Sequence, residues 1–312
     1  MKAVITGGTG LVARYVAEKL DSQGFEVILV VSDGRDSFAE ELYSGNKNCR
    51  IVSRTDFFSE ECLNNIIPGA YVVHTAFTRK NEGHEVAKSL DYAYTLFDAY
   101  KKHGAKGVVN CSSRSIYEEP KEGEFNTEDS PINPTALIST AKYGEELMLR
   151  AFFDETKIQF TNLRIASINE LKTDNNMVRP LNIFVDCVMN GNNIRVFNGT
   201  QTMSFVDPRD VANAVCLILS SDKAWKPVYN VGAGSLCTEK LLDMAKKVVE
   251  IGVELGYPEA AIEIVEKDIT QTAGMSIDLI KQDFGYEPAI SLEIMIRSLF
   301  SMKEEEKKKE NV

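Results

Sequence analysis

Histidine is scarce in this sequence, and its cysteines show no paired spacing. Three histidines (His74, His84 and His103) are too few and too scattered to predict a histidine-built metal centre. The six cysteines lie far apart, so we expect reduced thiols rather than a disulfide framework or a zinc site. No apolar run approaches the roughly 20 residues that a membrane-spanning helix needs. These absences argue against a disulfide-rich secreted fold and an integral membrane protein.

Positive charge is also in deficit. With 35 Lys and Arg against 46 Asp and Glu, the 312-residue chain carries a formal net charge of -11 and a pI near 5.0. Clustered positive charge is the footprint of nucleic-acid binding, so we expect no nucleic-acid partner. The first residues contain no basic segment followed by a secretory apolar region. We therefore expect a cytoplasmic protein that does not associate with membranes.

What the sequence does contain is a glycine turn between an apolar strand and a helix. Residues 2–6 predict the strand, and Leu11 and Val12 open the helix. Gly7 allows a tight turn and Gly10 lets the backbone approach a pyrophosphate, while the helix N-terminus offers unpaired N–H groups to phosphates. Plain turns also collect glycine, but a strand directly before the turn and a helix directly after it favour dinucleotide binding.

Strand and helix patterns alternate through the first half of the chain. The predicted strands cover residues 25–31, 51–53, 70–76, 107–113 and 159–165, and the predicted helices cover residues 85–102 and 142–153. This alternation predicts an α/β fold built on a doubly wound, Rossmann-type parallel sheet. Ligands bind beyond the carboxyl ends of the strands in such sheets. We therefore expect Gly7, Asp56, Thr75 and Ser113 to face one cleft.

The second half predicts a smaller C-terminal substrate lobe. Asp207 is expected to cap a helix over 211–219, Thr238 to cap one over 239–255, and Ser291 to cap the last helix. A further helix is predicted at 180–189 and a strand at 228–231. The domains are assigned as residues 1–166 with 205–231 returning to them, a lobe of 167–204 and 232–302, and a frayed, charged tail over 303–312.

Several short motifs follow one another as they do in a known family. Thr6–Ala13 matches TGGxGxxA, His74–Ala76 matches an HxA loop, and Cys111–Tyr117 is similar to an SSxxVYG strand end. Phe205–Ala212 is similar to FVxVxDVA, Val228–Gly232 to a YNVG strand, and Ser276–Leu292 to DxSKAxxxLGYxPxxSLEEG. Together these motifs make the sequence resemble the extended short-chain dehydrogenase/reductase family, in its NAD-dependent epimerase/dehydratase branch.

The resemblance implies NAD(P) in the Rossmann domain, a nucleotide sugar under the C-terminal lobe, and a homodimer formed through two helices of the first domain. Ser113 takes the position of the serine that orients the substrate oxygen. Lys142 takes that of the lysine that binds the ribose hydroxyls, because Glu146 follows it at the family's interval. The cofactor-binding residues implied by the motifs are Gly7, Gly10, Leu11, Val12, Asp56, Phe57, Thr75 and Ala76. Asp56 stands where the family uses an aspartate to contact adenine.

The sequence departs from the family where the catalytic tyrosine should stand. Ile138 lies four residues before Lys142, and an isoleucine cannot exchange a proton. The loss of a general base lowers a rate by roughly 10²–10⁴. Tyr143 follows Ile138 by five residues, which is about 140° around a helix. Its side chain should therefore point away from the nicotinamide. Tyr117 or a group on the C-terminal lobe remains as a substitute proton carrier.

The residues that would hold a diphosphate are altered as well. Met203 stands where many relatives have an arginine that binds the diphosphate of the nucleotide sugar, and an apolar side chain cannot do so. Asn169-Glu170 replaces the usual Tyr-Gly. Arg164, Arg179 and Arg195 remain as possible partners for an anion.

The choice between NAD and NADP rests on the end of the second strand. Relatives that use NAD usually have an acid there that binds the ribose 2′-hydroxyl, but this sequence has Val31. Asp33 could still reach the ribose diol, whereas Ser32 with Arg35 could receive a 2′-phosphate. NAD is favoured because the branch commonly uses it, and NADP stays open.

Three functions remain open. The first is a working NAD(P)-dependent epimerase, dehydratase or reductase acting on a nucleotide sugar or related polyol, with altered proton-transfer machinery. The second is a catalytically impaired relative that binds NAD(P) as a structural or sensor ligand. The third is a family enzyme whose substrate lacks a diphosphate and needs no tyrosine base. We predict the first, because Ser113 and Lys142 are both present.

Overall fold

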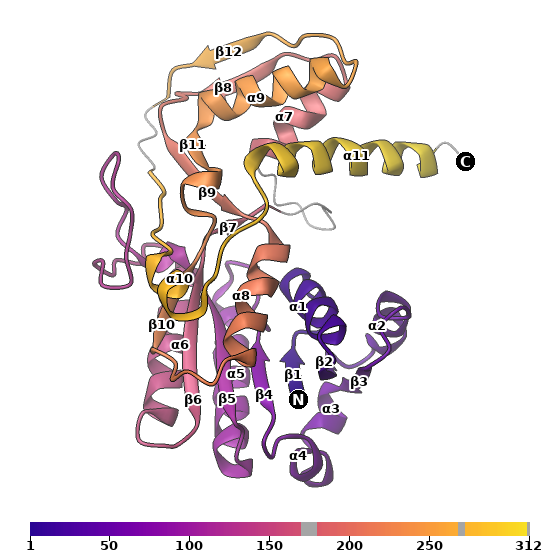
Figure 1. Cartoon of the computed structure of the whole chain (residues 1–312), viewed down its shortest axis with the longest axis vertical. Coiled ribbons are helices and arrows are strands. Elements are labelled where there is room, and N and C mark those ends of the chain that lie inside the picture. Colours follow the sequence, from indigo (N-terminus) through magenta and orange to yellow (C-terminus); the bar gives the residue numbers. More distant parts are fainter. Residues whose placement is uncertain (170–179, 268–271, 311–312) are drawn as a thin grey trace.

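A seven-stranded parallel sheet forms the framework of the first part of the chain (Figure 1). The computed structural model describes residues 1–169, 180–267 and 272–310. In spatial order the strands are β10 (Val228–Val231), β6 (Gln159–Ile165), β5 (Gly107–Ser113), β4 (Tyr71–His74), β1 (Lys2–Thr6), β2 (Glu26–Val31) and β3 (Cys49–Ser53). The winding reverses between β1 and β4, and in such sheets the ligand crevice forms at this reversal.

Helices cover both faces of the sheet, so its strands are buried on both sides and read as unbroken apolar runs. Ala3 and Ile5 of β1 belong to the core under two helices, α1 (Leu11–Ser22) and α8 (Pro208–Ser220). Val4, which points the opposite way, belongs to the core under α5 (Gly83–His103) and α6 (Leu137–Phe153). The shorter helices are α2 (Asp36–Leu42), α3 (Arg54–Phe57), α4 (Glu60–Ile66) and α10 (Asp278–Phe284). The predicted doubly wound α/β fold is confirmed.

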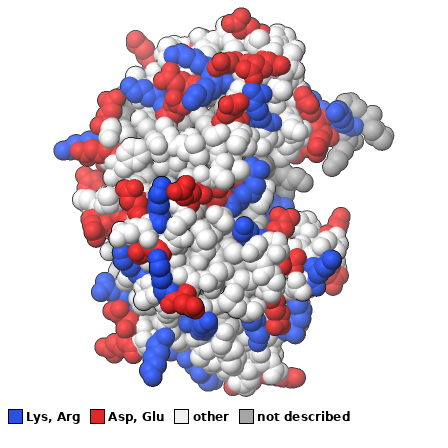
Figure 2. All heavy atoms as spheres, in the orientation of Figure 1, with Lys and Arg blue, Asp and Glu red and all other residues white. Residues whose placement is uncertain are grey.

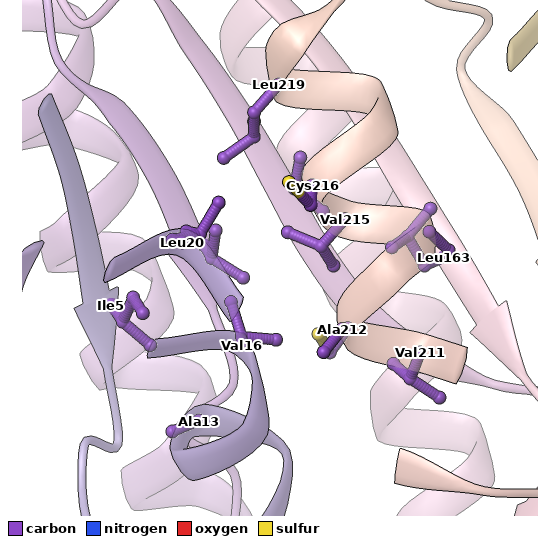
Figure 3. Packing of buried hydrophobic residues seen from close by; sticks show 14 of the residues in the cluster. Ile5, Ala13, Val16, Leu20, Leu163, Val211, Ala212, Val215, Cys216 and Leu219 are labelled. Atoms are coloured by element: carbon purple, nitrogen blue, oxygen red, sulfur yellow. The ribbon is translucent and has the colours of Figure 1, made fainter. Parts of the chain in front are cut away.

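The helix α8 brings a late segment of the chain back to this sheet. It packs along α1, and Val16 of α1 and Val215 of α8, both fully buried, belong to the apolar core that the two helices share (Figure 3). Asp207 caps α8 as predicted, because its carboxylate accepts the backbone N–H of Arg209 at 2.9 Å. β10 then adds to the edge of the sheet beside β6.

A smaller part of the molecule, at the top of Figure 1, has a core of its own. Its helices are α7 (Pro180–Met189), α9 (Leu241–Glu254) and α11 (Leu292–Glu310), with a parallel strand pair β8 (Ile194–Phe197) and β12 (Ile262–Val265). The strands β7 (Ser167–Ile168), β9 (Thr202–Val206) and β11 (Thr238–Lys240) form a three-stranded sheet. Two short 3₁₀ helices are η1 (Arg114–Ile116) and η2 (Gly234–Cys237). Ser291 caps α11 as predicted, since its hydroxyl accepts the N–H of Ile294.

Two predictions for this smaller part are wrong. Thr238 opens the strand β11 instead of capping a helix, because its hydroxyl is hydrogen-bonded to Ser204 Oγ at 2.9 Å and β11 pairs antiparallel with β9. The charged tail is not frayed over its described residues: α11 runs unbroken to Glu310, and the Lys303 ammonium forms an ion pair with Asp186 of α7 at 2.7 Å.

The surface shows mixed charge. Lys and Arg are interspersed with Asp and Glu over the face shown in Figure 2, without a continuous field of either sign. Over the residues that the structure describes, no helix is both long and apolar enough to cross a membrane. The six cysteines all lie in described segments and carry free thiols.

A buried polar cluster joins α6 to β6 and to the edge strand β10. The Arg164 guanidinium of β6 binds both oxygens of Glu146 of α6, with the shortest contact at 2.8 Å. It also donates to the Tyr117 hydroxyl at 2.9 Å, and that hydroxyl donates to Asn230 of β10 at 2.7 Å. The Arg164 and Glu146 side chains are only 6% and 4% exposed, so neither charge can turn to water instead.

Replacement of Glu146 by Gln should therefore destabilise the protein strongly. It leaves the Arg164 charge buried without its partner, which typically costs about 3–5 kcal/mol. Arg195→Gln is the matched control, because the ion pair of Arg195 with Glu263 is mostly exposed and contributes about 1 kcal/mol or less. Urea unfolding followed by the fluorescence of the single tryptophan measures both. A loss for Glu146→Gln no larger than that of the control would contradict this assignment.

Candidate active site

The glycine turn after β1 has the geometry that a close backbone approach requires. Gly7 has a φ of +70°, and a Cβ there would lie 2.9 Å from Cα of Ala76. The Gly10 N–H donates to the Gly7 carbonyl at 2.7 Å and closes the turn. Gly10 is also the N-cap of α1 and no side chain caps the helix there, so the first N–H groups of α1 are left for a ligand.

A hollow of about 430 Å³ opens beside this turn, at the carboxyl ends of β1, β2 and β4. The sequence-predicted residues that line it are Gly7, Gly10, Leu11, Val12, Thr75 and Ala76. Arg54, Phe77, Ser89 and Tyr92 line it too, and no sequence pattern indicated Arg54 or Tyr92. The hollow lies at the reversal of winding between β1 and β4, where the crevice was expected.

A second hollow of about 480 Å³ continues from the first at the ends of β5 and β6. Ser113 and Lys142 line it, together with Ser112, Arg114 and Ser167. Five residues line both hollows, namely Leu11, Val12, Thr75, Phe77 and Arg79. The glycine turn and the serine–lysine pair, distant in the sequence, therefore belong to one continuous cleft.

Four predicted cofactor residues do not line this cleft. Asp56 lines a separate hollow next to α4, where its carboxylate accepts the Ser53 hydroxyl at 2.8 Å. Phe57 is fully buried in the core under α5. Asp33 and Arg35 lie exposed on the loop after β2, and Asp33 accepts the N–H of Thr55 at 2.8 Å. The expectation that Asp56 shares one cleft with Gly7, Thr75 and Ser113 is wrong, because the helix α3 turns its side chain towards Ser53.

Lys142 is held firmly at the wall of the second hollow. Its Nζ donates to the Cys111 carbonyl of β5 at 2.9 Å and to Glu145 Oε2 at 2.7 Å. Nζ also lies 4.1 Å from the centroid of the Phe77 ring, a cation–π distance. Lys142 is 7% exposed, so its ammonium meets the cleft without being immersed in water.

Glu145 continues this contact into the protein interior. Its other oxygen, Oε1, is hydrogen-bonded to Nε2 of His74 at 2.9 Å, and Nδ1 of His74 is hydrogen-bonded to the Thr6 hydroxyl at 2.7 Å. Glu145, His74 and Thr6 have no exposed surface. Burial alone would raise the pKa of Glu145, but the Lys142 ammonium and the His74 contact outweigh it and hold that pKa below its ordinary value of 4.5.

The end of β5 presents two serine hydroxyls. Ser113 Oγ accepts the N–H of Ser115 at 3.2 Å and lies 2.9 Å from its hydroxyl oxygen. Ser112 is 6% exposed, and its Oγ has no hydrogen-bond partner among the residues described. A buried hydroxyl without a partner is unfavourable, so Ser112 is suited to a ligand that enters the hollow.

Of the residues that the structure describes, no tyrosine lines the hollow around Ser113 and Lys142. Ile138 lies in the first turn of α6, one turn before Lys142. Tyr143 is absent from the lining of either hollow. Tyr117 does not act as the substitute carrier, because Arg164 and Asn230 occupy its hydroxyl and burial raises its pKa to about 12 despite the opposing charge of Arg164.

The candidate anion partners lie elsewhere. Arg164 is engaged by Glu146, and Arg195 forms a surface pair with Glu263. Met203 packs against the core of the smaller part. Arg179 and Glu170 fall outside the described residues.

A family model covers most of this chain. The model for the NAD dependent epimerase/dehydratase family matches residues 3–232. The chain belongs to this family. It is 26% identical to the UDP-glucose 4-epimerase of Corynebacterium glutamicum, over 92% of this chain and 91% of that one. It is 25% identical to the low-salt glycan biosynthesis protein Agl12 of Haloferax volcanii, over 94% and 95%.

Solved structures of epimerases share the fold. A UDP-glucose 4-epimerase from Thermotoga maritima, solved with UDP-glucose, superposes with a TM-score of 0.78 at 23% identity, over 98% of this chain and 99% of that one. A UDP-glucuronic acid 4-epimerase from Bacillus cereus, solved with UDP-glucuronic acid and NAD, gives a TM-score of 0.78 at 16% identity, over 97% and 99%. The match extends across both parts of this family member.

The low pKa of Glu145 makes a contribution to stability that depends on pH. A carboxyl whose pKa falls on folding stabilises the protein above its unfolded pKa, and this contribution is lost as the pH falls through the folded pKa. The difference in unfolding free energy between the wild type and Glu145→Gln should therefore be constant from pH 7 to about 5 and shrink below about 4.5. Urea titrations across this range measure it, with the exposed Glu119→Gln as control. A difference independent of pH would contradict the buried ion pair.

Proposed function

We propose that this protein is an NAD(P)-dependent oxidoreductase of the epimerase/dehydratase type, acting on a nucleotide sugar or a related polyol with altered proton-transfer machinery. The observation that carries the proposal is the continuous cleft. One end is the glycine turn at the N-terminus of α1, and the other holds Ser113 and Lys142. Family membership supports the reaction class, and the nucleotide-sugar complexes of its structural neighbours support the substrate class.

The first hollow suits a dinucleotide. The Gly7 turn and the open N–H groups of α1 favour a pyrophosphate, because backbone donors and the positive end of the helix dipole converge there. Lys142, across the cleft, can donate to a ribose hydroxyl. Bound NAD(P) would accept or return a hydride, and this chain would position it and the substrate carbon that exchanges the hydride.

We favour NAD over NADP. NAD is present in structures of a neighbouring UDP-glucuronic acid 4-epimerase, which supports this choice. The alternative has support as well, because Ser32 and Arg54 line the first hollow whereas the Asp33 carboxylate is engaged by Thr55 and Arg54 outside its lining. A 2′-phosphate would meet a cation in Arg54.

The second hollow suits the substrate. Ser113 is placed to donate a hydrogen bond to a substrate oxygen, and Lys142 provides a positive charge close to it. Ser167 and Ile168, at the start of the smaller part, also line this hollow, which supports the role of that part as a substrate lobe. With Ile138 in place of the family's tyrosine, the substrate's hydroxyl proton has to leave by another route.

Calorimetric titration of nucleotide-free protein with NAD, NADH, NADP and NADPH tests the proposal. We expect at least one to bind with micromolar affinity or better, with NAD tighter than NADP. Gly7→Ala is the matched variant: an alanine in this left-handed conformation is strained and its Cβ meets Ala76, so binding should weaken at least tenfold. Absence of binding by all four nucleotides would sink the proposal.

A catalytically impaired binding protein is the second candidate function, and the isoleucine at position 138 favours it. Ile138→Tyr separates the two. If the cleft keeps an otherwise intact substrate site, a phenol one turn before Lys142 should restore a proton carrier and raise turnover of UDP-glucose or a related nucleotide sugar by about 10²-fold or more. Ile138→Phe, which adds the ring without the hydroxyl, is the control. No gain over Ile138→Phe, with dinucleotide binding intact, would favour the impaired binding protein.

A homodimer formed through α5 and α6 belongs to the same proposal. Tyr94 of α5 and Leu147 of α6 are 55% and 50% exposed, which is unusual for large apolar side chains on neighbouring helices. Phe152 packs edge-on against Tyr94 between the two helices. The mass of the protein in solution decides whether the dimer forms.

A further inference from the structure

Four polar side chains form one hydrogen-bonded chain behind the wall of the cleft. It runs from Lys142 through Glu145 and His74 to Thr6, and joins α6 to the ends of β4 and β1. The family motifs account for Lys142 and for the place of His74, but they assign nothing to Glu145. Because Glu145 is three residues after Lys142, the helix turns both side chains to the same face, towards the sheet.

The hydrogen-bonding capacity of this chain is used almost completely. The two ring nitrogens of His74 are both engaged, Nε2 with Glu145 Oε1 and Nδ1 with the Thr6 hydroxyl. Each oxygen of Glu145 then has one donor, and its negative charge balances the Lys142 ammonium. Lys142 has three N–H donors, of which Glu145 and the Cys111 carbonyl take two. One N–H is left to a molecule bound in the hollow that Lys142 lines.

This hydrogen-bonded row of side chains also reaches the glycine turn. Thr6 is the residue before Gly7, and its carbonyl accepts the hydroxyl of Thr75 at 2.7 Å. Thr75 in turn lines both hollows. Movement of the Lys142 end of the chain is therefore opposed by contacts anchored in β1 and β4 at the other end of the cofactor site.

We propose that Glu145, backed by His74, is a positioning residue that holds the Lys142 ammonium ready for the ribose hydroxyls of the bound dinucleotide. This inference rests on the proposed function. A lysine side chain is long and flexible, and the apolar Ile138 offers it no hydrogen bond from the preceding turn. Glu145 supplies the fixed partner from the following turn, with its Oε2 2.7 Å from Nζ. Lys142 then meets the ligand in one place, without first having to be ordered.

The test uses ligands that differ by the one ribose. ADP-ribose contains the ribose that follows the pyrophosphate in NAD, whereas ADP lacks it. Calorimetry with wild type, Glu145→Gln, Lys142→Met and the double variant gives the affinities. We expect Glu145→Gln to weaken binding of NAD and ADP-ribose about tenfold and to leave ADP within twofold. The double variant should bind ADP-ribose no more weakly than Lys142→Met alone, because Glu145 acts through Lys142.

A second measurement needs no change at Glu145, in case that variant does not fold. In protein labelled with ¹⁵N-lysine, the ammonium resonance of Lys142 is assigned by its absence from Lys142→Met. It should shift when ADP-ribose is added and stay in place when ADP is added.

Each remaining outcome counts against the proposal. Equal weakening of ADP and ADP-ribose would give Glu145 a general structural role. An unchanged affinity of Glu145→Gln for ADP-ribose would exclude the positioning role, and so would a Lys142 resonance that does not shift when ADP-ribose is added. Neither result would contradict dinucleotide binding. Failure of wild-type protein to bind NAD, ADP-ribose and ADP would overturn the proposed function itself, and this inference with it.

Discussion

The charges that α6 carries into the interior determine how the site is built. A buried charge is tolerated only with a partner, and each of the three on α6 has one and also contacts a different strand. Lys142 binds the backbone of β5, Glu145 binds His74 at the end of β4, and Glu146 binds Arg164 of β6. These contacts fix the rotation and height of α6 against the sheet. The geometry of the cleft wall is therefore set by these ion pairs and hydrogen bonds. Hydrophobic packing alone would not specify it.

The fold was predictable because its determinants are local. Apolar runs such as Val27–Val31 give buried strands, and Asp207 marks a helix start with its own side chain. The alternation of these elements then implies the parallel sheet and the edge at which ligands bind. Gly7, Gly10 and Ser113 could be placed at that edge for the same reason, whereas Lys142 was placed by the family resemblance.

Two of the parts that were missed depend on contacts between distant residues, and the third on a short helix. His74 and Glu145 are 71 positions apart, and nothing around either one indicates the other. Asp56 follows a strand and was expected in the cleft, but the short helix α3 that begins directly after β3 carries its side chain elsewhere. Thr238 has the chemistry of a helix cap, and only its pairing with Ser204 on β9 makes it part of a strand. Periodicity and capping signals describe the neighbourhood of a residue, whereas the His74–Glu145 contact and the pairing of Thr238 depend on residues far away in the sequence.

The late return of the chain to the sheet has a consequence for how the protein is made. β10 is the edge strand beside β6, and its Asn230 accepts a hydrogen bond from the hydroxyl of Tyr117, 113 positions earlier. α8, which packs along α1 and covers one face of the sheet, is also synthesised late. A nascent chain that ends before α8 therefore lacks that cover, and one that ends before residue 230 leaves the Tyr117 hydroxyl without this acceptor. Such long-range pairing slows folding. The Rossmann-type sheet of this protein is thus completed only after the first segment of the smaller part, residues 167–204, has been synthesised.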